Sequence, residues 1–589
     1  MPQLLDWLQI AVVIAIILLL VRPVGSYIAS VFTGKPTFLD RVLDPVDRAI
    51  YRLGGIDVAV QQTWWPYTRS MLVTNGVMLV ILFVILELQH LLPLNPDGMG
   101  PIEPFLAFNT AASFITNTNW QSYGGEYTMS YFSQLFAIIF PMFTSAATGL
   151  ACGIAFIRGL AGSTRLGNFY VDLVRSITRV LLPISFVTAI AFVALGVPAT
   201  FDGAATATTL NGPIAAPPAA NGGPAPTLSP VAAGQQTIAR GVVAPLIAIK
   251  HLGTNGGGWF NTNSAHPFEN PSPLTNVLQN VLMALIPTAI IYALGLMLMN
   301  RRQAATFFWV MAGFFGVFLV IAYVGEALIG NTITNGLGLD PSQGSMEGKE
   351  VRFGQALTAL FVTSTTAFTT GTVNAMHDSL TPLASITPFS QMLLNMIFGG
   401  KGVGFINLII FAILGIFLTG LMVGRTPEFL GKKIEVREVK LAAGAFLMHP
   451  FLILFGAAIT IALSLNLASI PNGGFHGFSE LLYAYTSAAA NNGSAFAGLN
   501  ANVPWFNASL GVAMILGRYA SIILMLALAG SLAAKRRTPM TVGTMRTDTG
   551  LFGGVLAGTI LVVGALTFFP VLALGPIAEQ FAMLAGKVF

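Results

Sequence analysis

Long apolar runs without charge alternate with shorter polar segments along the whole chain. Runs such as 307–325 and 551–569 contain no Asp, Glu, Lys or Arg. Uncharged apolar runs of about 18 residues or more indicate membrane-spanning helices. We therefore predict an all-α polytopic membrane protein with ten spans. Their approximate limits are 4–21, 71–91, 132–156, 180–197, 275–299, 305–330, 383–422, 441–465, 509–532 and 551–573, the seventh being broken by glycines.

The composition supports a membrane protein and argues against several other classes. The chain is 54% hydrophobic and only 9% charged, whereas roughly a quarter of a soluble domain is charged. The net charge of +5 comes from residues at the ends of apolar runs, so we expect no nucleic-acid partner. The lone Cys152 allows no disulfide framework, and His251, His266 and His377 lack partners at metal-ligand spacing.

The basic residues give the spans an orientation. Of the 28 Lys and Arg residues, 21 lie in one alternating set of inter-helix segments. Such segments face the cytoplasm, which places both termini outside. Residues 1–7 contain no Lys or Arg, so the basic start of a signal peptide is missing and we expect the first run to be a retained span. Segment 203–236, rich in Ala, Pro, Gly and Thr, predicts an irregular outer insertion.

Spans two to nine form four pairs with a common pattern. In each pair, the outer segment holds an apolar stretch too short to cross a membrane, followed by a run of small and amide residues. These stretches and runs are 105–115 with 116–121, 242–249 with 253–258, 356–366 with 369–372, and 481–490 with 491–494. Helix, short helix, extended loop and helix is the plan of a potassium-channel pore. We predict four pore repeats, 71–157, 180–300, 305–424 and 441–534, flanked by 1–70 and 551–589.

The loops suit a cation filter. Extended backbone is tolerated at membrane depth only where it is buried in protein or lines water, and rings of its carbonyl oxygens can replace the hydration shell of K⁺. Gly permits unusual backbone angles, and Asn and Thr side chains can hold such a loop. One run alone would indicate a surface turn, but four runs in equivalent places favour a pore.

Two features predict barriers beneath the filter. Arg518 lies mid-span in the ninth helix, where its charge is costly unless it faces water or a partner. We expect it to face the pore and repel a cation below the filter, or else to snorkel to the inner interface. The glycine-rich break at 398–404 predicts an unwound gating loop through Gly400, Lys401 and Gly402, or else close helix packing.

Signals for ATP hydrolysis are absent from the sequence. No Gly-Lys pair is followed by Ser or Thr as a P-loop requires, and the Asp-Lys-Thr-Gly signature of P-type pumps is missing. We expect no nucleotide to bind this chain and no catalytic residues in it, so energy comes from a partner or an ion gradient. An intramembrane enzyme would need clustered Asp, Glu, His or Ser at membrane depth, which the sequence does not show.

Several long motifs carry a resemblance to a known family. The chain resembles the potassium-binding A subunit of the bacterial Kdp pump over nearly its whole length, apart from segment 203–236. The motifs that carry it are 108–110, 116–121, 252–258, 266–271, 375–379, 424–434 and 489–499. The resemblance implies a bacterial inner-membrane complex with a P-type ATPase catalytic subunit, an accessory single-span subunit and a small stabilising peptide.

The resemblance also implies site residues. It places K⁺-binding backbone at Asn117, Thr118, Asn119, Thr254, Asn255, Gly256, Thr369, Thr370, Gly371, Asn491, Asn492 and Gly493. It links Gln121 to affinity and Arg518 to the pore. The sequence departs from the family pattern in three ways: Thr369-Thr370 replace Ser-Cys, Asn395 replaces Glu, and Lys401 is charged. The favoured function is the potassium-selecting subunit of an ATP-driven pump, and the alternative is a free-standing potassium channel or symporter of the same plan.

Overall fold

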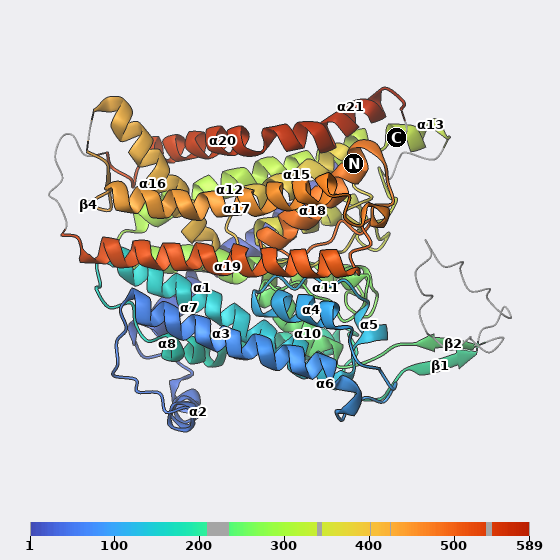
Figure 1. Ribbon diagram of the computed structural model, residues 1–589, viewed down its shortest axis with the longest axis horizontal. Coiled ribbons are helices and arrows are strands. Elements are labelled where there is room, and N and C mark those ends of the chain that lie inside the picture. The colour runs from blue at the N-terminus through green and yellow to red at the C-terminus, as the bar shows by residue number, and fades with distance from the viewer. Residues whose placement is uncertain are drawn as a thin grey trace.

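The molecule is a bundle of long helices that lie side by side (Figure 1). The computed structural model describes residues 2–208, 235–338, 344–400, 402–424, 426–536 and 545–587. Lys401 and most of the predicted insertion 203–236 lie outside these ranges. The described ends of the insertion pair as an antiparallel hairpin, β1 (Ala205–Thr208) with β2 (Gln235–Ile238).

The prediction of ten spans is confirmed: ten described helices are long and apolar enough to cross a membrane. They contain α1 (Pro2–Thr33), α3 (Trp64–Glu87), α7 (Phe140–Ala161), α9 (Leu182–Ala194), α11 (Pro273–Met297), α12 (Arg301–Tyr323), α16 (Gly404–Val423), α17 (Val436–Ala462), α19 (Pro504–Ala534) and α20 (Gly550–Leu572). π-helical turns at Gln134–Ile139, Ser176–Leu181, Val324–Ile329 and Ala573–Ile577 extend four of them.

The seventh predicted span is two helices rather than one. α15 (Pro382–Leu394) ends at Asn395, whose φ of 46° is left-handed, and α16 begins at Gly404. The break therefore starts three residues before the first position that the glycine pattern indicated. Only α16 is long and apolar enough to span by itself.

Four shorter helices each precede one of the predicted filter runs. They are α4 (Pro104–Ile115), α10 (Val243–Leu252), α14 (Gly354–Ala367) and α18 (Gly474–Ala489). Local sequence explains where α4 begins: Pro104 occupies the first turn, where its missing N–H costs nothing, and the Glu103 side chain accepts a hydrogen bond from the Leu106 N–H. In chain order the elements repeat as α3–α4–α7, α9–α10–α11, α12–α14–α15/α16 and α17–α18–α19.

The remaining elements are short. They are α2 (Asp40–Leu53), α5 (Gly125–Thr128), α6 (Tyr131–Ser133), α8 (Phe169–Arg175), α13 (Thr332–Gly336), α21 (Ala578–Leu584), the 3₁₀ turns Gln89–Leu91, Asn263–Ala265 and Leu467–Ser469, and the hairpin of β3 (Glu428–Phe429) with β4 (Lys432–Lys433). α2 is held against the bundle by Arg179, which forms ion pairs with Asp40, Asp44 and Asp47.

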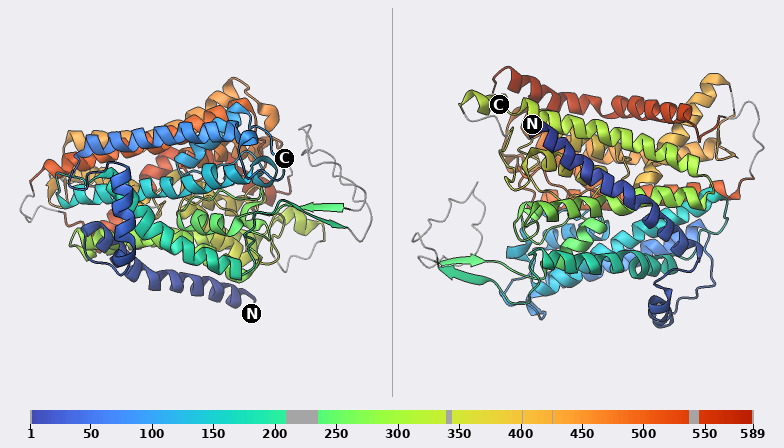
Figure 2. Two further views of the ribbon diagram at one scale, coloured as in Figure 1. Left: turned by 90° about the horizontal axis from the view of Figure 1, so that it is seen from below. Right: turned by 180° about the vertical axis from the view of Figure 1, so that it is seen from behind.

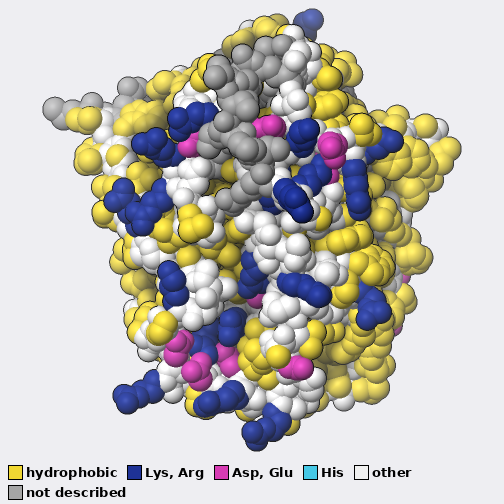
Figure 3. Space-filling view, turned by 90° about the vertical axis from the view of Figure 1, so that its left-hand side faces the viewer, with side chains coloured by type: hydrophobic (Ala, Val, Ile, Leu, Met, Phe, Trp, Pro, Cys, Tyr) yellow, Lys and Arg dark blue, Asp and Glu magenta, His cyan; other side chains and the backbone are white. Residues whose placement is uncertain are grey.

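The two ends of the bundle differ in charge. Figure 3 looks onto the end that carries α2 and the β3–β4 hairpin, and this face is crowded with Lys and Arg. Its exposed basic residues include Arg41, Arg48, Arg52, Lys433 and Arg536. Both termini and the β1–β2 hairpin lie at the opposite end (Figures 1 and 2).

A buried ion pair fastens the basic end of the bundle. Arg158, at the end of α7, makes two hydrogen bonds to the Asp172 carboxylate at 2.6 and 3.0 Å, and the Tyr67 hydroxyl donates to the same carboxylate at 3.0 Å. Asp172 is almost completely buried. Removing one member of such a pair leaves the other charge uncompensated in a low-dielectric interior.

We expect Asp172→Asn to lower the free energy of unfolding by about 3–5 kcal/mol, because Arg158 loses its counter-charge. Thermal unfolding in detergent measures the effect. Asp548→Asn is the matched control, since Asp548 pairs with Arg546, whose side chain is 54% exposed, and exposed pairs contribute less than about 1 kcal/mol. Equal melting temperatures for both variants would contradict the assignment.

Candidate functional site: a ring of four loops

The four loops that follow the short helices share one backbone conformation. The first and third residues of each loop have left-handed φ angles. The pairs are Asn117 (62°) and Asn119 (59°), Thr254 (41°) and Gly256 (97°), Thr369 (51°) and Gly371 (86°), and Asn491 (53°) and Gly493 (93°). Alternation between left-handed and other conformations makes successive N–H groups converge on one side of a chain. The carbonyl oxygens of these loops are therefore turned the other way.

The converging N–H groups bind the end of the preceding short helix. In loop one, the N–H groups of Thr118 and Asn119 both donate to the Ser113 carbonyl, at 3.0 and 3.1 Å. Loops two and three repeat this with the carbonyls of Lys250 and Thr365. In loop four, Asn492 N–H donates to the Ser487 carbonyl and Gly493 N–H to the Ser487 hydroxyl. In all four loops the middle residue thus donates its N–H to the carbonyl of the residue five positions before it.

Close backbone contacts show that the loops form a ring. A Cβ placed on Gly256 would lie 2.0 Å from the Thr370 carbonyl oxygen, so loop two abuts loop three. A Cβ on Gly371 would lie 2.0 Å from the Asn492 carbonyl oxygen, and a Cβ on Gly493 would lie 1.8 Å from the Thr118 carbonyl oxygen. Loops three and four, and four and one, are therefore also in contact, which explains why only glycine fits at these three positions.

Side-chain amides join the remaining pair, loops one and two. Asn117 Nδ2 donates to the Thr254 carbonyl at 2.8 Å, and Asn255 Nδ2 donates to Asn117 Oδ1 at 2.7 Å. Gln121 adds a second connection above them: its Nε2 donates to the Gly258 carbonyl at 3.0 Å and its Oε1 accepts from the Gly258 N–H at 2.7 Å. The Gln121 side chain thus links loop one to loop two through two hydrogen bonds.

The middle residues of the loops contribute a ring of backbone oxygens. Thr118, Asn255, Thr370 and Asn492 are each fully buried. Their carbonyl oxygens accept no hydrogen bond from any described residue, whereas the carbonyls of Thr254 and Gly256 each accept a side-chain amide. Buried carbonyls normally have partners, so these four oxygens, which have no donor among the described residues, are available to coordinate a cation.

A buried ion pair next to loop two, formed by Lys250 and Glu269 and called the charged brace below, was not predicted from the sequence. Lys250 forms a fully buried ion pair with Glu269, and its ammonium also donates to Asn263 Oδ1. Glu269 Oε1 accepts the N–H groups of Trp259 and Phe260, at 2.7 and 2.9 Å. Spacing gave no signal for this pair, because 19 residues and a loop separate its members. A Glu within the motif 266–271 was the only available indication.

Asn263 connects this brace to the ring. Its Nδ2 donates to the Gly256 carbonyl at 2.7 Å, and its Oδ1 accepts from the Thr372 hydroxyl at 2.9 Å. One side chain therefore contacts loop two, loop three and the buried ion pair. Its φ of 55° is left-handed, a conformation that Asn adopts more readily than most residues.

A small cavity of about 50 Å³ lies against the ring. Loops one, three and four contribute Asn117, Thr369 and Asn491 to its wall, and Arg518 and Gly400 also line it. This volume holds a few water molecules.

Arg518 is 7% exposed and forms no ion pair or hydrogen bond with any described residue. It lines the cavity wall, so the structure does not show it reaching out to an aqueous interface.

The unwound segment between α15 and α16 passes close to the ring. Gly399 N–H donates to the Ala367 carbonyl at 2.9 Å, and a Cβ on Gly400 would lie 3.4 Å from Thr254 Oγ1. A Cβ on Gly402 would approach the Gly149 carbonyl to 2.4 Å, so the segment also packs tightly on α7. Lys401, predicted as a second barrier, lies outside the described residues.

Asn395, the first residue of the unwound segment, connects two loops. Its Nδ2 donates to the Ala490 carbonyl at 3.4 Å, and its Oδ1 accepts from the Thr369 hydroxyl at 3.5 Å. Asn395 thereby joins the bases of loops three and four with long, neutral hydrogen bonds.

Comparisons with known proteins identify the family of the chain. The family described as "Potassium-transporting ATPase A subunit" matches residues 11–581. A "Potassium-transporting ATPase potassium-binding subunit" from Alicyclobacillus acidocaldarius is 53% identical over 562 residues, which are 95% of this chain and 96% of the relative.

A structural neighbour shares the fold alone. The potassium transporter TrkH from Vibrio parahaemolyticus matches with a TM-score of 0.51 and 14% identity, over 86% of this chain and 97% of that one. The sequence relationships are far closer and cover nearly every described element. On these grounds the chain belongs to the family of potassium-transporting ATPase A subunits.

Proposed function

We propose that the chain selects K⁺ from the extracytoplasmic side and passes it to the P-type ATPase catalytic subunit of an ATP-driven uptake pump. The observation that carries this proposal is the buried ring of donor-free carbonyl oxygens at Thr118, Asn255, Thr370 and Asn492. Oxygens without competing donors can replace the water around a cation. The name of the Alicyclobacillus relative, a potassium-binding subunit, supports K⁺ as that cation.

The other predicted filter residues would assist this ring. The backbone at Asn119, Gly371 and Gly493 continues the alternating conformation, while Thr254 and Gly256 already share their carbonyls with side-chain amides. We therefore assign the principal ligands to the four middle residues. The substitution of Thr370 for Cys leaves this assignment intact, because the ligand is a backbone oxygen.

The charge of the two ends supports uptake from outside. The Lys- and Arg-rich end (Figure 3) would face the cytoplasm of a bacterial inner membrane, and both termini would then be extracytoplasmic. Figure 1 shows α4, α10 and α18 in the half of the bundle nearer to the termini. In this orientation the ring is reached from the outside before the cavity and Arg518.

Energy would come from the partner subunits. The relative's name describes it as part of a potassium-transporting ATPase, and this sequence contains neither a P-loop nor an aspartyl-phosphate signature. We propose a complex with a P-type ATPase catalytic subunit, an accessory single-span subunit and a small stabilising peptide, with the apolar spans in contact with lipid. Arg518 would prevent a cation from passing straight from the ring into the cytoplasm.

Reconstitution tests the proposed function. Proteoliposomes that hold this chain together with its ATPase and accessory subunits should take up K⁺ only with ATP, whereas the chain alone should not. Vesicles with an ATPase subunit that lacks its phosphorylated Asp are the control. Equal uptake by the chain alone would instead support a free-standing channel or symporter.

Gly493→Ala should weaken K⁺ binding to the complex by more than about tenfold, or 1.4 kcal/mol. An added methyl group would collide with the Thr118 carbonyl, and φ at Gly493 is 93°. The K⁺ dependence of ATP hydrolysis, with Na⁺ as competitor, measures the change. Gly316→Ala in α12 is the control, because nothing lies within 4 Å of its added Cβ; an equal effect there would refute the ring assignment.

Arg518→Ala should produce an ATP-independent leak of Rb⁺ through the reconstituted complex, because removing the guanidinium lowers the electrostatic barrier in the cavity. Tracer efflux without ATP measures it. Arg518→Lys keeps the positive charge and should leak less. An Arg518→Ala complex as tight as the unmodified one would show that the barrier lies elsewhere.

A further inference from the structure

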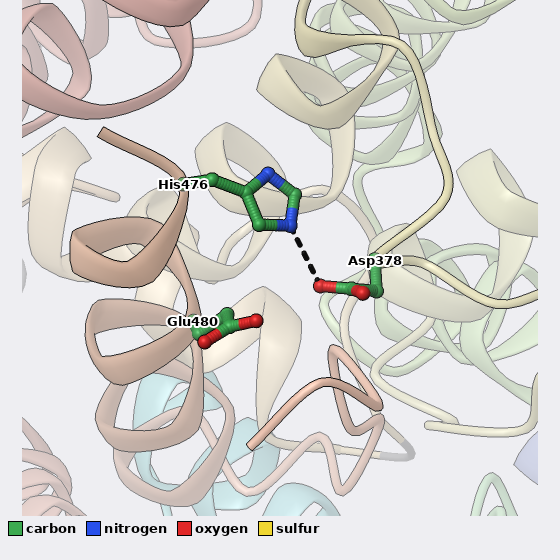
Figure 4. A group of neighbouring side chains, drawn as sticks. All are labelled: Asp378, His476 and Glu480. Carbon is green, nitrogen blue, oxygen red and sulfur yellow. Dashed lines mark hydrogen bonds and ion pairs between the residues drawn. The ribbon is translucent and has the colours of Figure 1, made fainter. Parts of the chain in front are cut away.

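Four titratable side chains gather at the end of the bundle that carries the termini, apart from the ring. Asp378 follows loop three, His476 and Glu480 lie about one turn apart on α18 (Figure 4), and Glu579 belongs to α21. One ligand atom from each of Asp378, His476 and Glu480 lies within 4.8 Å of the others. No other group of His, Cys, Asp and Glu among the described residues has this geometry, and His251, His266 and His377 are not part of it.

Glu480 forms no ion pair with any described residue, and His476, the basic group of the cluster, already pairs with Asp378 and Glu579. The Glu480 side chain is fully buried, and although Oε1 accepts from Asn472 Nδ2 at 2.7 Å, no described residue donates to Oε2 or forms an ion pair with this carboxyl group. Burying an ionised carboxylate without a partner is costly. The group therefore requires either a proton or a cation beside it.

The carboxylates of Glu480 and Asp378 pack directly against Gly498. A Cβ at this position would lie 2.2 Å from Glu480 Oε1 and 2.8 Å from Asp378 Oδ1. The backbone of Gly498 does not need glycine, since its φ is not left-handed. The reason for a glycine here is thus steric: any side chain would occupy the place where both carboxylates converge.

Both ring nitrogens of His476 lie at hydrogen-bonding distance from carboxylates. Nε2 lies 2.8 Å from Asp378 Oδ1, and Nδ1 lies 2.8 Å from Glu579 Oε1. A histidine that binds a metal through one nitrogen almost always donates from the other to a carboxylate or carbonyl, which fixes its tautomer. Glu579 provides that carboxylate, and Asn472 orients Glu480 in the same way.

We propose that Asp378, His476 and Glu480 bind a divalent first-row transition metal ion, for which Zn²⁺ is the probe. The ligands are His476 Nε2 and one oxygen from each carboxylate, a mixed nitrogen and oxygen set that suits such ions. The metal takes the place of the proton between His476 and Asp378, and that proton leaves to solvent. Small side-chain rotations bring the ligand atoms to bonds of about 2.0–2.2 Å.

A metal at this place would connect two parts of the pore. The Asp378 N–H donates to the Phe496 carbonyl, just beyond loop four, at 2.6 Å, while His476 and Glu480 belong to the short helix before that loop. The ion would therefore fasten the segment after loop three to both sides of loop four. It would stabilise the outer part of the protein without contacting the carbonyl ring.

Zinc binding to the full-length chain tests the proposal. After treatment with a chelator and its removal, we expect one Zn²⁺ per chain by elemental analysis and calorimetry, and a higher melting temperature with Zn²⁺ than without it. His476→Gln and Glu480→Gln should each weaken binding by more than about tenfold. His266→Gln is the control, because His266 stacks on Phe260 outside the cluster.

Gly498→Ala retains the three ligand side chains but crowds Glu480 Oε1 and Asp378 Oδ1. It should abolish the Zn²⁺-dependent rise in melting temperature. An unmodified chain that binds no Zn²⁺ would overturn the proposal and leave a protonated Glu480 as the explanation. Binding that persists in both Glu480→Gln and Gly498→Ala, or that is equalled by Ca²⁺, would overturn it too.

Discussion

The structure depends on four buried residues, one in each loop, whose carbonyl oxygens accept no hydrogen bond from any described residue. Such an arrangement is unfavourable by itself, and it persists because the other groups of the same loops are satisfied. A helix leaves its last carbonyls without intrahelical partners. In three repeats one of these, at Ser113, Lys250 or Thr365, accepts both converging N–H groups of the loop that follows, whereas at Ser487 the carbonyl accepts one and the hydroxyl the other. Helix end and loop thus satisfy each other, and the middle carbonyls of the loops are left without a donor among the described residues.

Four covalently joined repeats allow each quarter of the ring to differ. Three loops have glycine at the third position, where a Cβ would collide with the next loop, but loop one has Asn119. Between loops one and two, amide side chains replace that close backbone contact. Loop two is supported by the buried pair of Lys250 and Glu269. A symmetric tetramer could not confine a charged brace to one quarter of its filter.

Sequence periodicity was sufficient for the spans and the short helices, because both are set by local apolar content. It was insufficient wherever the burial or conformation of a residue depends on a contact with a distant part of the chain. No apolar or basic pattern predicts that Lys250 is buried, yet it is fully buried, since Glu269 compensates its charge across a loop. The sequence pattern predicted that the break after α15 lies at the glycines of 398–404. In the structure the break begins at Asn395, whose left-handed conformation is supported by hydrogen bonds to Thr369 and Ala490. Nothing in a linear pattern distinguishes this Asn from its neighbours.

The cavity beneath the ring is asymmetric, and this constrains the path of an ion. Its wall comes mainly from repeats three and four, through residues such as Asn407, Phe446 and His449. The glycine segment packs against α7 on the side of repeat one, and Arg518 adds a positive charge. The cavity is therefore closed towards repeat one and bordered by the positive charge of Arg518. If the ring binds K⁺ as proposed, an ion released into this cavity would contact mainly repeats three and four.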